Sequence, residues 1–192
     1  MSESDYWQDR YCKGNMSGIG SIGKWRKWKW DLINKYVNIK EKELLDIGCG
    51  DISFMKRKNP LTYTGIDLSS HIIDINRKKE PKWNFLVADS TTDIKESVPM
   101  ADVVFAMDLL FHIMDDRGFC RLLNNLNHWT REWLFVSNWS KRPSTSYDER
   151  YQCFRSLKLY LEYLPDLDLI DEIVGMDGIN TLYVFKRKDL PH

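Results

Sequence analysis

The 192-residue sequence lacks an excess of charge of either sign and has few cysteines. Its 28 Lys and Arg residues balance 28 Asp and Glu residues, whereas nonspecific phosphate binding depends on a clear cationic excess. We therefore expect no dedicated nucleic-acid binding. The four cysteines form no Cys-x-x-Cys pair, which excludes common zinc spacings and a disulfide-dense secreted scaffold. Reduced thiols are expected.

Long hydrophobic runs and a recognisable leader are also missing. The most apolar stretch, residues 101–114, is interrupted by Asp102, Asp108 and His112 and is too short to cross a bilayer. The N-terminal residues MSESDYWQDR have neither the basic nor the apolar region of a signal peptide. We therefore expect a soluble, cytoplasmic protein that does not insert into a membrane.

From residue 43 onward, short apolar runs alternate with helical patterns. Strands are predicted over residues 43–47, 61–67, 83–88, 102–107, 133–137, 168–174 and 181–186, and helices over 52–58, 69–79, 115–128 and 151–163. The turn between the last two strands is short and requires antiparallel pairing. The pattern predicts a doubly wound α/β fold: a mainly parallel seven-stranded sheet with an antiparallel last strand and helices on both faces.

The first 40 residues differ in composition, with eight Lys and Arg against four Asp and Glu and with four of the eight tryptophans. Residues 24–36 predict an amphipathic helix whose inward face carries Trp25, Trp28, Leu32 and Tyr36. The glycine-rich run SGIGSIG precedes this helix. We therefore expect residues 1–40 to form an N-terminal helical lid and residues 41–192 to form the main domain.

A glycine loop follows the first predicted strand in LLDIGCGD, residues 44–51. Gly48 and Gly50 permit a tight turn and the close approach of a ligand. Asp46 stands just before the loop, where a carboxylate repels a pyrophosphate and attracts a cation. Ser53 replaces the last glycine of G-x-G-x-x-G. The predicted ligand therefore carries positive charge and lacks phosphates, which disfavours NAD.

Two further acidic residues end the next two strands. Asp67 lies about 20 residues beyond the glycine loop, where a carboxylate accepts both hydroxyls of a ribose. Asp89 ends the third strand, where it can accept a hydrogen bond from an exocyclic amine such as adenine N6. Aspartates also cap helices. Their occurrence with Asp46 at three successive strand ends favours one shared site.

Together these residues resemble the class I S-adenosylmethionine-dependent methyltransferases. LDIGCG resembles the first motif of that family, GID its ribose-binding acid, VAD its adenine-side motif and DVVFAMDLLFHI its fourth-strand motif. The resemblance covers about residues 43–186 and implies S-adenosylmethionine as cofactor, with S-adenosylhomocysteine as product. The cofactor contacts that it implies are Asp46, Gly48 and Gly50 around the methionine moiety, Asp67 at the ribose, and Asp89 with Ser90 near the adenine. Cys49, Leu68 and Asp108 are expected as further cofactor contacts. Ile52 departs from the family, which often has a third glycine there.

The segment MDLLFHIMDD, residues 107–116, carries the candidate acid-base chemistry. Asp108 follows a strand that reads as fully buried, and His112 lies one turn later. Histidine is the side chain best suited to accept a proton at neutral pH. We predict His112 as the base, with Asp108 orienting it or acting as the base itself; the alternative is a histidine that packs or caps the next helix. No metal-ligand cluster stands out, so metal independence is expected.

The acceptor is expected to be a small molecule or a glycan. The polar, aromatic and basic loop at residues 138–155 suits an acceptor-binding wall or a plain connection. The opening segment resembles those of some small glycan-modifying methyltransferases, so the predicted reaction is methylation of a hydroxyl on a small polar acceptor such as a sugar. Alternatives are N-methylation of a small molecule or nucleic acid, a non-catalytic S-adenosylmethionine-binding subunit, and an NAD-dependent oxidoreductase. The Asn/Asp-Pro-Pro-Tyr and Pro-Cys signatures of base methylation are absent.

Overall fold

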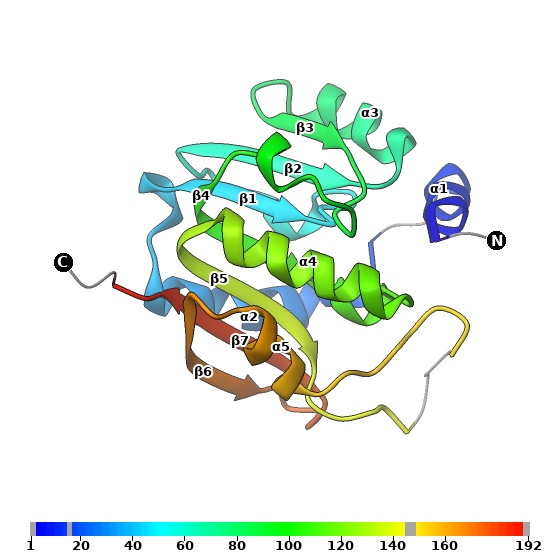
Figure 1. Cartoon of the computed structure of the whole chain (residues 1–192). Coiled ribbons are helices and arrows are strands. Elements are labelled where there is room, and N and C mark those ends of the chain that lie inside the picture. Colours follow the sequence, from blue (N-terminus) through cyan, green and yellow to red (C-terminus); the bar gives the residue numbers. More distant parts are fainter. Residues whose placement is uncertain (1–2, 15–16, 145–148, 190–192) are drawn as a thin grey trace.

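The computed structural model describes residues 3–14, 17–144 and 149–189, and a seven-stranded sheet forms its centre (Figure 1). The strands are β1 (Glu43–Ile47), β2 (Thr62–Asp67), β3 (Asn84–Val87), β4 (Ala101–Met107), β5 (Thr130–Trp139), β6 (Leu167–Val174) and β7 (Asn180–Arg187). Their order is β3-β2-β1-β4-β5-β7-β6; β7 pairs antiparallel with β5 and β6, and the other neighbours pair parallel. The predicted fold class is confirmed.

Helices cover both faces of this sheet (Figure 1). They are α1 (Glu3–Cys12), α2 (Gly23–Tyr36), α3 (Ser70–Lys79), α4 (Asp116–Trp129) and α5 (Leu157–Tyr163), with short 3-10 turns η1 (Ile19–Ser21), η2 (Ile39–Glu41), η3 (Ser53–Met55), η4 (Lys95–Ser97) and η5 (Leu110–His112). Buried side chains of α2 and α3 share one core with one face of the sheet, and those of α4 and α5 share a second core with the other face. No helix within the described ranges is long and apolar enough to span a bilayer.

The central strand β4 explains why an uninterrupted apolar run stands in the sequence. Residues 103–106 are fully buried, because layers of side chains cover both faces of the sheet at this point. The strand ends at Met107, so Asp108 lies at the carboxyl edge of the sheet. This edge faces α1 (Figure 1), and the strand order reverses there between β1 and β4.

The helix predicted over residues 52–58 is wrong, because only the 3-10 turn η3 forms there. Ile52 and Arg57 adopt left-handed backbone conformations, with φ of 56° and 61°, which a continuous helix does not allow. The Arg26 side chain of α2 donates hydrogen bonds to the carbonyl groups of Ser53 and Phe54 at 3.0 and 2.9 Å. The turn is thus held by Arg26 of α2 in addition to its own short-range hydrogen bonds, such as that from the Met55 N–H to the Ile52 carbonyl at 2.9 Å.

The helix predicted over residues 151–163 begins only at Leu157. The preceding residues 152–156 have no regular secondary structure, and the Cys153 N–H donates to the carbonyl of Phe111 in η5 at 2.7 Å. The Cys153 N–H is therefore bound to a carbonyl of another segment and not to a carbonyl within the predicted helix. Residues 145–148 of the predicted acceptor loop lie outside the described residues.

The buried face of α2 differs in part from the predicted one. Leu32 is buried as expected, whereas Trp25, Trp28 and Tyr36 are only half-buried. The deepest side chains are Ile33, Lys29 and Trp30, at 0%, 1% and 3% exposure. Tryptophans occur on both sides of this helix, so their spacing alone does not identify the face that packs on the sheet. No element is predicted over Glu3–Cys12, where the structure has α1.

Candidate cofactor and acceptor site

A cavity of about 410 Å³ lies at the carboxyl edge of the sheet. Its wall combines the ends of β1 to β4 with residues of α1, η1 and α2. The predicted site residues on this wall are Asp46, Gly48, Cys49, Asp67, Leu68, Asp89, Ser90, Asp108 and His112. Gly50 is not on the wall; its N–H donates to Asp67 Oδ2 at 2.9 Å. The structure thus brings the predicted residues of four strand ends around one space.

Asp46 is buried at the end of β1, where its side chain accepts a hydrogen bond from one hydroxyl of the described residues. The Tyr63 hydroxyl donates to Asp46 Oδ2 at 2.9 Å. Burial raises the pKa of Asp46 to about 7, partly offset by the Tyr63 hydrogen bond and reinforced by the nearby Asp67. A cationic ligand in the cavity would favour the ionised carboxylate, so this position suits a positive charge and opposes a phosphate.

Asp67 holds the glycine loop and the start of α3 together. Its Oδ2 accepts from the Gly50 N–H and its Oδ1 from the Ser69 N–H, both at 2.9 Å. Burial raises the pKa of this carboxyl, and the backbone hydrogen bonds oppose that shift. Each oxygen retains a second lone pair, so the carboxylate can still accept from a diol in the cavity.

The glycine loop has no backbone N–H left over for a phosphate. The N–H groups of Gly48 and Cys49 donate to the Ile66 carbonyl at 2.8 and 3.0 Å, and the Asp51 N–H donates to Ser17 Oγ at 3.0 Å. With the Gly50 N–H bound to Asp67, all four donors at residues 48–51 are engaged. The loop also leads into the short turn η3 rather than into an α-helix whose N-terminus could hold an anion.

Ile52 retains the backbone conformation for which a glycine would be expected. Its φ of 56° lies in the left-handed region, as do those of Gly48 and Gly50 at 69° and 54°. The Ile52 side chain is 8% exposed and packs in the core beneath the loop. The departure from the family motif therefore leaves the left-handed turn in place, with burial of the side chain offsetting backbone strain.

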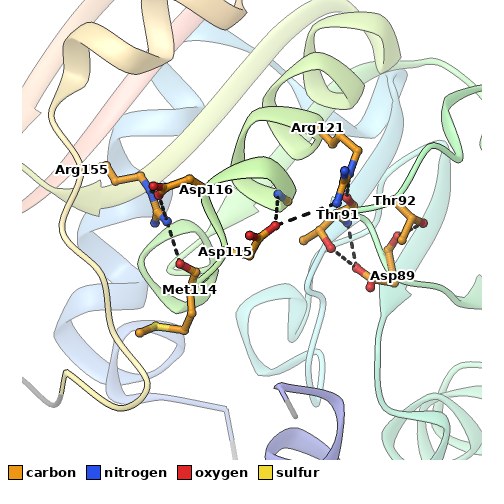
Figure 2. Close-up of polar contacts among 9 residues, drawn as sticks. Asp89, Thr91, Thr92, Met114, Asp115, Asp116, Arg121 and Arg155 are labelled. Atoms are coloured by element: carbon orange, nitrogen blue, oxygen red, sulfur yellow. Dashed lines mark hydrogen bonds and ion pairs between the residues drawn. The ribbon is translucent and has the colours of Figure 1, made fainter.

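Asp89 turns one oxygen inward to its own loop. The Thr91 N–H and hydroxyl both donate to Asp89 Oδ1, at 2.9 and 2.5 Å (Figure 2). Within the described ranges, Oδ2 accepts no hydrogen bond. The carboxylate lines the cavity and is half-buried, so this oxygen is suited to accept from an amine.

Asp108 is bound from two sides by protein groups. Its Oδ2 lies 2.5 Å from Lys29 Nζ, and its Oδ1 accepts from the Ser137 hydroxyl at 2.5 Å. Its φ of 53° is left-handed. Lys29 also donates to the Gly20 carbonyl at 3.2 Å, and a Cβ at position 20 would overlap the Asp108 carboxylate. Asp108 therefore joins η1, α2 and β5 at the floor of the cavity, where both its oxygens are already engaged.

His112 is oriented by a backbone carbonyl rather than by Asp108. Its Nδ1 lies 2.9 Å from the Tyr151 carbonyl oxygen, and its ring meets the Trp7 ring edge-on at 4.9 Å between centroids. Burial lowers the pKa of His112, although the Tyr151 carbonyl and the charge of Asp108 oppose this shift. A carbonyl only accepts, so Nδ1 carries the proton and Nε2 is left as the basic nitrogen of a neutral ring.

Several cavity residues are missing from the sequence-based site. They are Tyr6, Trp7, Arg10 and Tyr11 of α1, Lys29 of α2, and Phe111, Trp139, Gln152 and Asn180. The signal for α1 in the sequence is its three aromatic residues, Tyr6, Trp7 and Tyr11. Among the described residues, no group of three His, Cys, Asp or Glu side chains is placed to hold a metal ion.

The segment before α2 covers the glycine loop. The Ser17 N–H donates to Asp51 Oδ2 at 3.1 Å, and a Cβ at Gly50 would meet the Ser17 hydroxyl and the Tyr11 hydroxyl. Ile33 and Trp30 fix α2 in the core, so we propose that lid motion is confined to the residues before α2. The lid itself remains a prediction.

S-adenosylhomocysteine is therefore expected to slow amide hydrogen exchange in residues 17–23 while leaving the core part of α2 unchanged. Exchange followed by mass spectrometry, with and without the ligand, measures both segments in one experiment. Equal protection of residues 17–23 in the two states would contradict a lid at this position.

The sequence of the site matches a known family. Residues 44–132, which include Asp46, Asp67 and Asp89, match the model described as a methyltransferase domain. Residues 44–132 carry a methyltransferase domain. The predicted family and its cofactor, S-adenosylmethionine, are confirmed.

Two similar proteins match the same part of the chain but carry the names of different reactions. The tRNA U34 carboxymethyltransferase of Nautilia profundicola is 30% identical over 102 residues, which are 48% of this chain and 33% of that protein. The ubiquinone biosynthesis O-methyltransferase of Coxiella burnetii is 26% identical over 98 residues, 48% of this chain and 41% of that protein. The chain thus matches less than half of the length of either relative.

A solved structure is similar over almost the whole chain. The N-methyltransferase NodS from Bradyrhizobium japonicum, determined with S-adenosylhomocysteine, has a TM-score of 0.75 and covers 98% of this chain and 100% of its own. Its sequence identity of 13% means that the likeness shows the fold. The methyltransferase fold thus extends beyond the matched segment, to α1 and α2 on one side and to β6 and β7 on the other.

Proposed function

We propose that this protein transfers the methyl group of S-adenosylmethionine to a hydroxyl of a small polar acceptor, with a sugar or glycan as the first acceptor class to test. The observation that carries the proposal is the shared cavity. It joins acidic residues at three successive strand ends, which suit an adenosine and a positive charge, to a neutral histidine whose basic nitrogen is free of its backbone hydrogen bond.

The cofactor end of the cavity fits S-adenosylmethionine better than a dinucleotide. Asp67 would accept the ribose hydroxyls, Asp89 an adenine amine, and Asp46 would favour the cationic part of the molecule. The occupied loop donors at residues 48–51 leave no cradle for a pyrophosphate. The same observation disfavours an NAD-dependent oxidoreductase.

The rest of the wall suits a small acceptor with flat faces and polar edges. The rings of Trp7, Phe111 and Trp139 line the cavity together with the amides of Gln152 and Asn180. Aromatic rings bury the apolar faces of a sugar or planar ring, while amides form hydrogen bonds with its hydroxyls.

When bound, S-adenosylmethionine supplies the activated methyl group. His112 then has one task, to accept the proton of the attacking hydroxyl at Nε2 while the Tyr151 carbonyl holds Nδ1–H. The surrounding protein aligns the acceptor and excludes water, with α1 and η1 covering the cavity. Asp108 is engaged by Lys29 and Ser137, so His112 is the better candidate for the base.

RNA is the second acceptor class, because one relative is named as a tRNA carboxymethyltransferase. Half-buried Trp25 and Trp28 lie on α2 beside exposed Lys24 and Lys27, a combination that can stack and bind single-stranded nucleic acid. Methyl incorporation from labelled S-adenosylmethionine into sugars, small amines and tRNA would separate the classes. Incorporation into amines alone would reject the hydroxyl as acceptor group, and incorporation into tRNA alone would reject the small acceptor; either result would keep the methyltransferase.

Cofactor binding is tested by Asp67→Ala. Loss of charge-assisted bonds to the ribose is expected to weaken binding of S-adenosylhomocysteine by about tenfold to a hundredfold. Asp74→Ala is the matched control, because it removes the same charge from an exposed site of α3. Isothermal titration calorimetry measures both variants. Tight NADH binding by the unmodified protein with no response to S-adenosylhomocysteine would reject the proposed cofactor site.

A further inference from the structure

The hydrogen bond between His112 and Tyr151 fixes which ring nitrogen carries the proton. The Tyr151 carbonyl oxygen lies 2.9 Å from Nδ1, so the bond forms only when Nδ1 is protonated. Neutral histidine free in water prefers the other tautomer, with the proton on Nε2. A base that uses Nε2 therefore depends on the position of one backbone carbonyl.

That carbonyl belongs to a short irregular segment, residues 151–155, which contacts η5. The Cys153 N–H donates to the Phe111 carbonyl at 2.7 Å. The Tyr151 ring stacks on the Tyr6 ring of α1 at 4.3 Å between centroids. These contacts fix the segment near its start, and neither of them involves a charge.

Arg155 anchors the other end of the same segment. Its side chain is 5% exposed, and its guanidinium donates to the Ile113 carbonyl at 2.7 Å. It also donates to the Met114 carbonyl at 3.1 Å and to Asp116 Oδ1 at 2.7 Å (Figure 2). It also lies 4.3 Å from the centroid of the Phe119 ring. Ile113 directly follows His112, so Arg155 joins residues 151–155 to the backbone beside His112.

We propose that Arg155 is a positioning residue for the base: by tying residues 151–155 to residues 113 and 114, it holds the Tyr151 carbonyl on His112 Nδ1 and keeps Nε2 unprotonated. The inference rests on the proposed role of His112. Arg155 is not on the cavity wall and contacts none of the predicted cofactor residues. Its guanidinium instead donates hydrogen bonds to two backbone carbonyls and one carboxylate.

The ion pair with Asp116 contributes little to this arrangement. The Asp116 side chain is 88% exposed, so water competes for the pair. The two carbonyl contacts are shielded, and a buried guanidinium without them would be costly. The positioning effect is therefore expected to depend on the shape of the guanidinium fork rather than on the charge of its partner.

Nitrogen-15 NMR of the imidazole in the cofactor-free protein tests this directly and needs no acceptor. In the unmodified protein, His112 is expected as the Nδ1–H tautomer at a pH above its pKa. Arg155→Met is expected to lower the ratio of the Nδ1–H to the Nε2–H tautomer by about fivefold to tenfold, as for loss of about one hydrogen bond. Asp116→Asn is the matched control and should leave the ratio unchanged.

Arg155→Lys keeps the charge but can reach the two carbonyls less well, so an intermediate ratio is expected. This variant decides the question if Arg155→Met does not fold, as judged by circular dichroism. An Nε2–H tautomer in the unmodified protein, or an unchanged ratio in folded Arg155 variants, would overturn the inference. Calorimetry with S-adenosylhomocysteine on the same samples reports separately on the cofactor site. If the unmodified protein did not bind S-adenosylhomocysteine, the proposed function would fail independently of the result for Arg155.

Discussion

Replacing His112 with alanine is expected to lower the rate of methyl transfer by about a hundredfold to ten-thousandfold, the usual contribution of a positioned general base. Its imidazole lines the cavity with Nδ1 bound to the Tyr151 carbonyl, so Nε2 is the nitrogen that can accept the proton of the attacking hydroxyl. The affinity for S-adenosylhomocysteine should remain nearly unchanged, because the residues proposed to hold that ligand are Asp46, Asp67 and Asp89, not His112. Single-turnover transfer to the identified acceptor, with calorimetry on the same variant, measures both quantities.

The pH dependence follows from the direction of the pKa shift. Protonated His112 cannot accept a proton, so the rate rises with pH through its pKa. An ordinary histidine would place this rise near 6.5, and burial lowers the pKa of His112, so the ascending limb should lie below that value. The pKa of Asp46, about 7, governs a different quantity: cofactor affinity should rise with pH as this carboxyl ionises.

His128→Ala serves as the control for the loss of a histidine, because His128 lies near the end of α4 and is not on the cavity wall. Its rate and pH profile should match those of the unmodified protein. Full activity in His112→Ala would remove the imidazole from the mechanism. Loss of cofactor binding in that variant would instead assign His112 a structural role, as its packing against Trp7 and Phe111 allows.

Much of the fold was predictable because it depends on local apolar patterns. The buried run of β4 and the alternation of strands with helices identify a parallel sheet, and the short turn before β7 fixes the direction of that strand. The helix expected at residues 52–58 does not form, and the apolar pattern of the sequence does not show why. Ile52 and Arg57 take left-handed conformations, and Arg26, about 27 residues earlier, binds the carbonyls of the turn.

The cofactor end of the site was predictable for a topological reason. The carboxyl ends of parallel strands lie at one edge of a sheet, so acidic residues at the ends of β1, β2 and β3 must gather there. The partners of Asp108 and His112 were not predictable. Lys29 comes from 79 residues before Asp108, and the Tyr151 group that meets His112 is a backbone carbonyl, which any residue type supplies.

Lys29→Met is expected to lower the free energy of unfolding by about 3 kcal/mol, toward the lower end for breaking a buried ion pair, because Asp108 is one-fifth exposed. The change leaves the Asp108 carboxylate with Ser137 as its main partner while it retains a left-handed backbone. Asp108→Asn should also destabilise the protein, since the ammonium of Lys29 would remain buried with the Gly20 carbonyl. Urea denaturation of the cofactor-free protein measures these changes.

The double variant Lys29→Met/Asp108→Asn measures the interaction free energy between Lys29 and Asp108 separately from their interactions with other residues. Removing both charges should cost about 2 kcal/mol less than the sum of the single changes, because no unpaired buried charge remains. Lys27→Met is the matched control: Lys27 and Asp31 are 2.6 Å apart on the same helix but exposed, so stability should change by less than about 0.5 kcal/mol. Additive effects of the two single changes would show that Lys29 and Asp108 stabilise the protein independently. In that case Asp108 would not be held by Lys29, and its carboxylate would again be a candidate for the base beside His112.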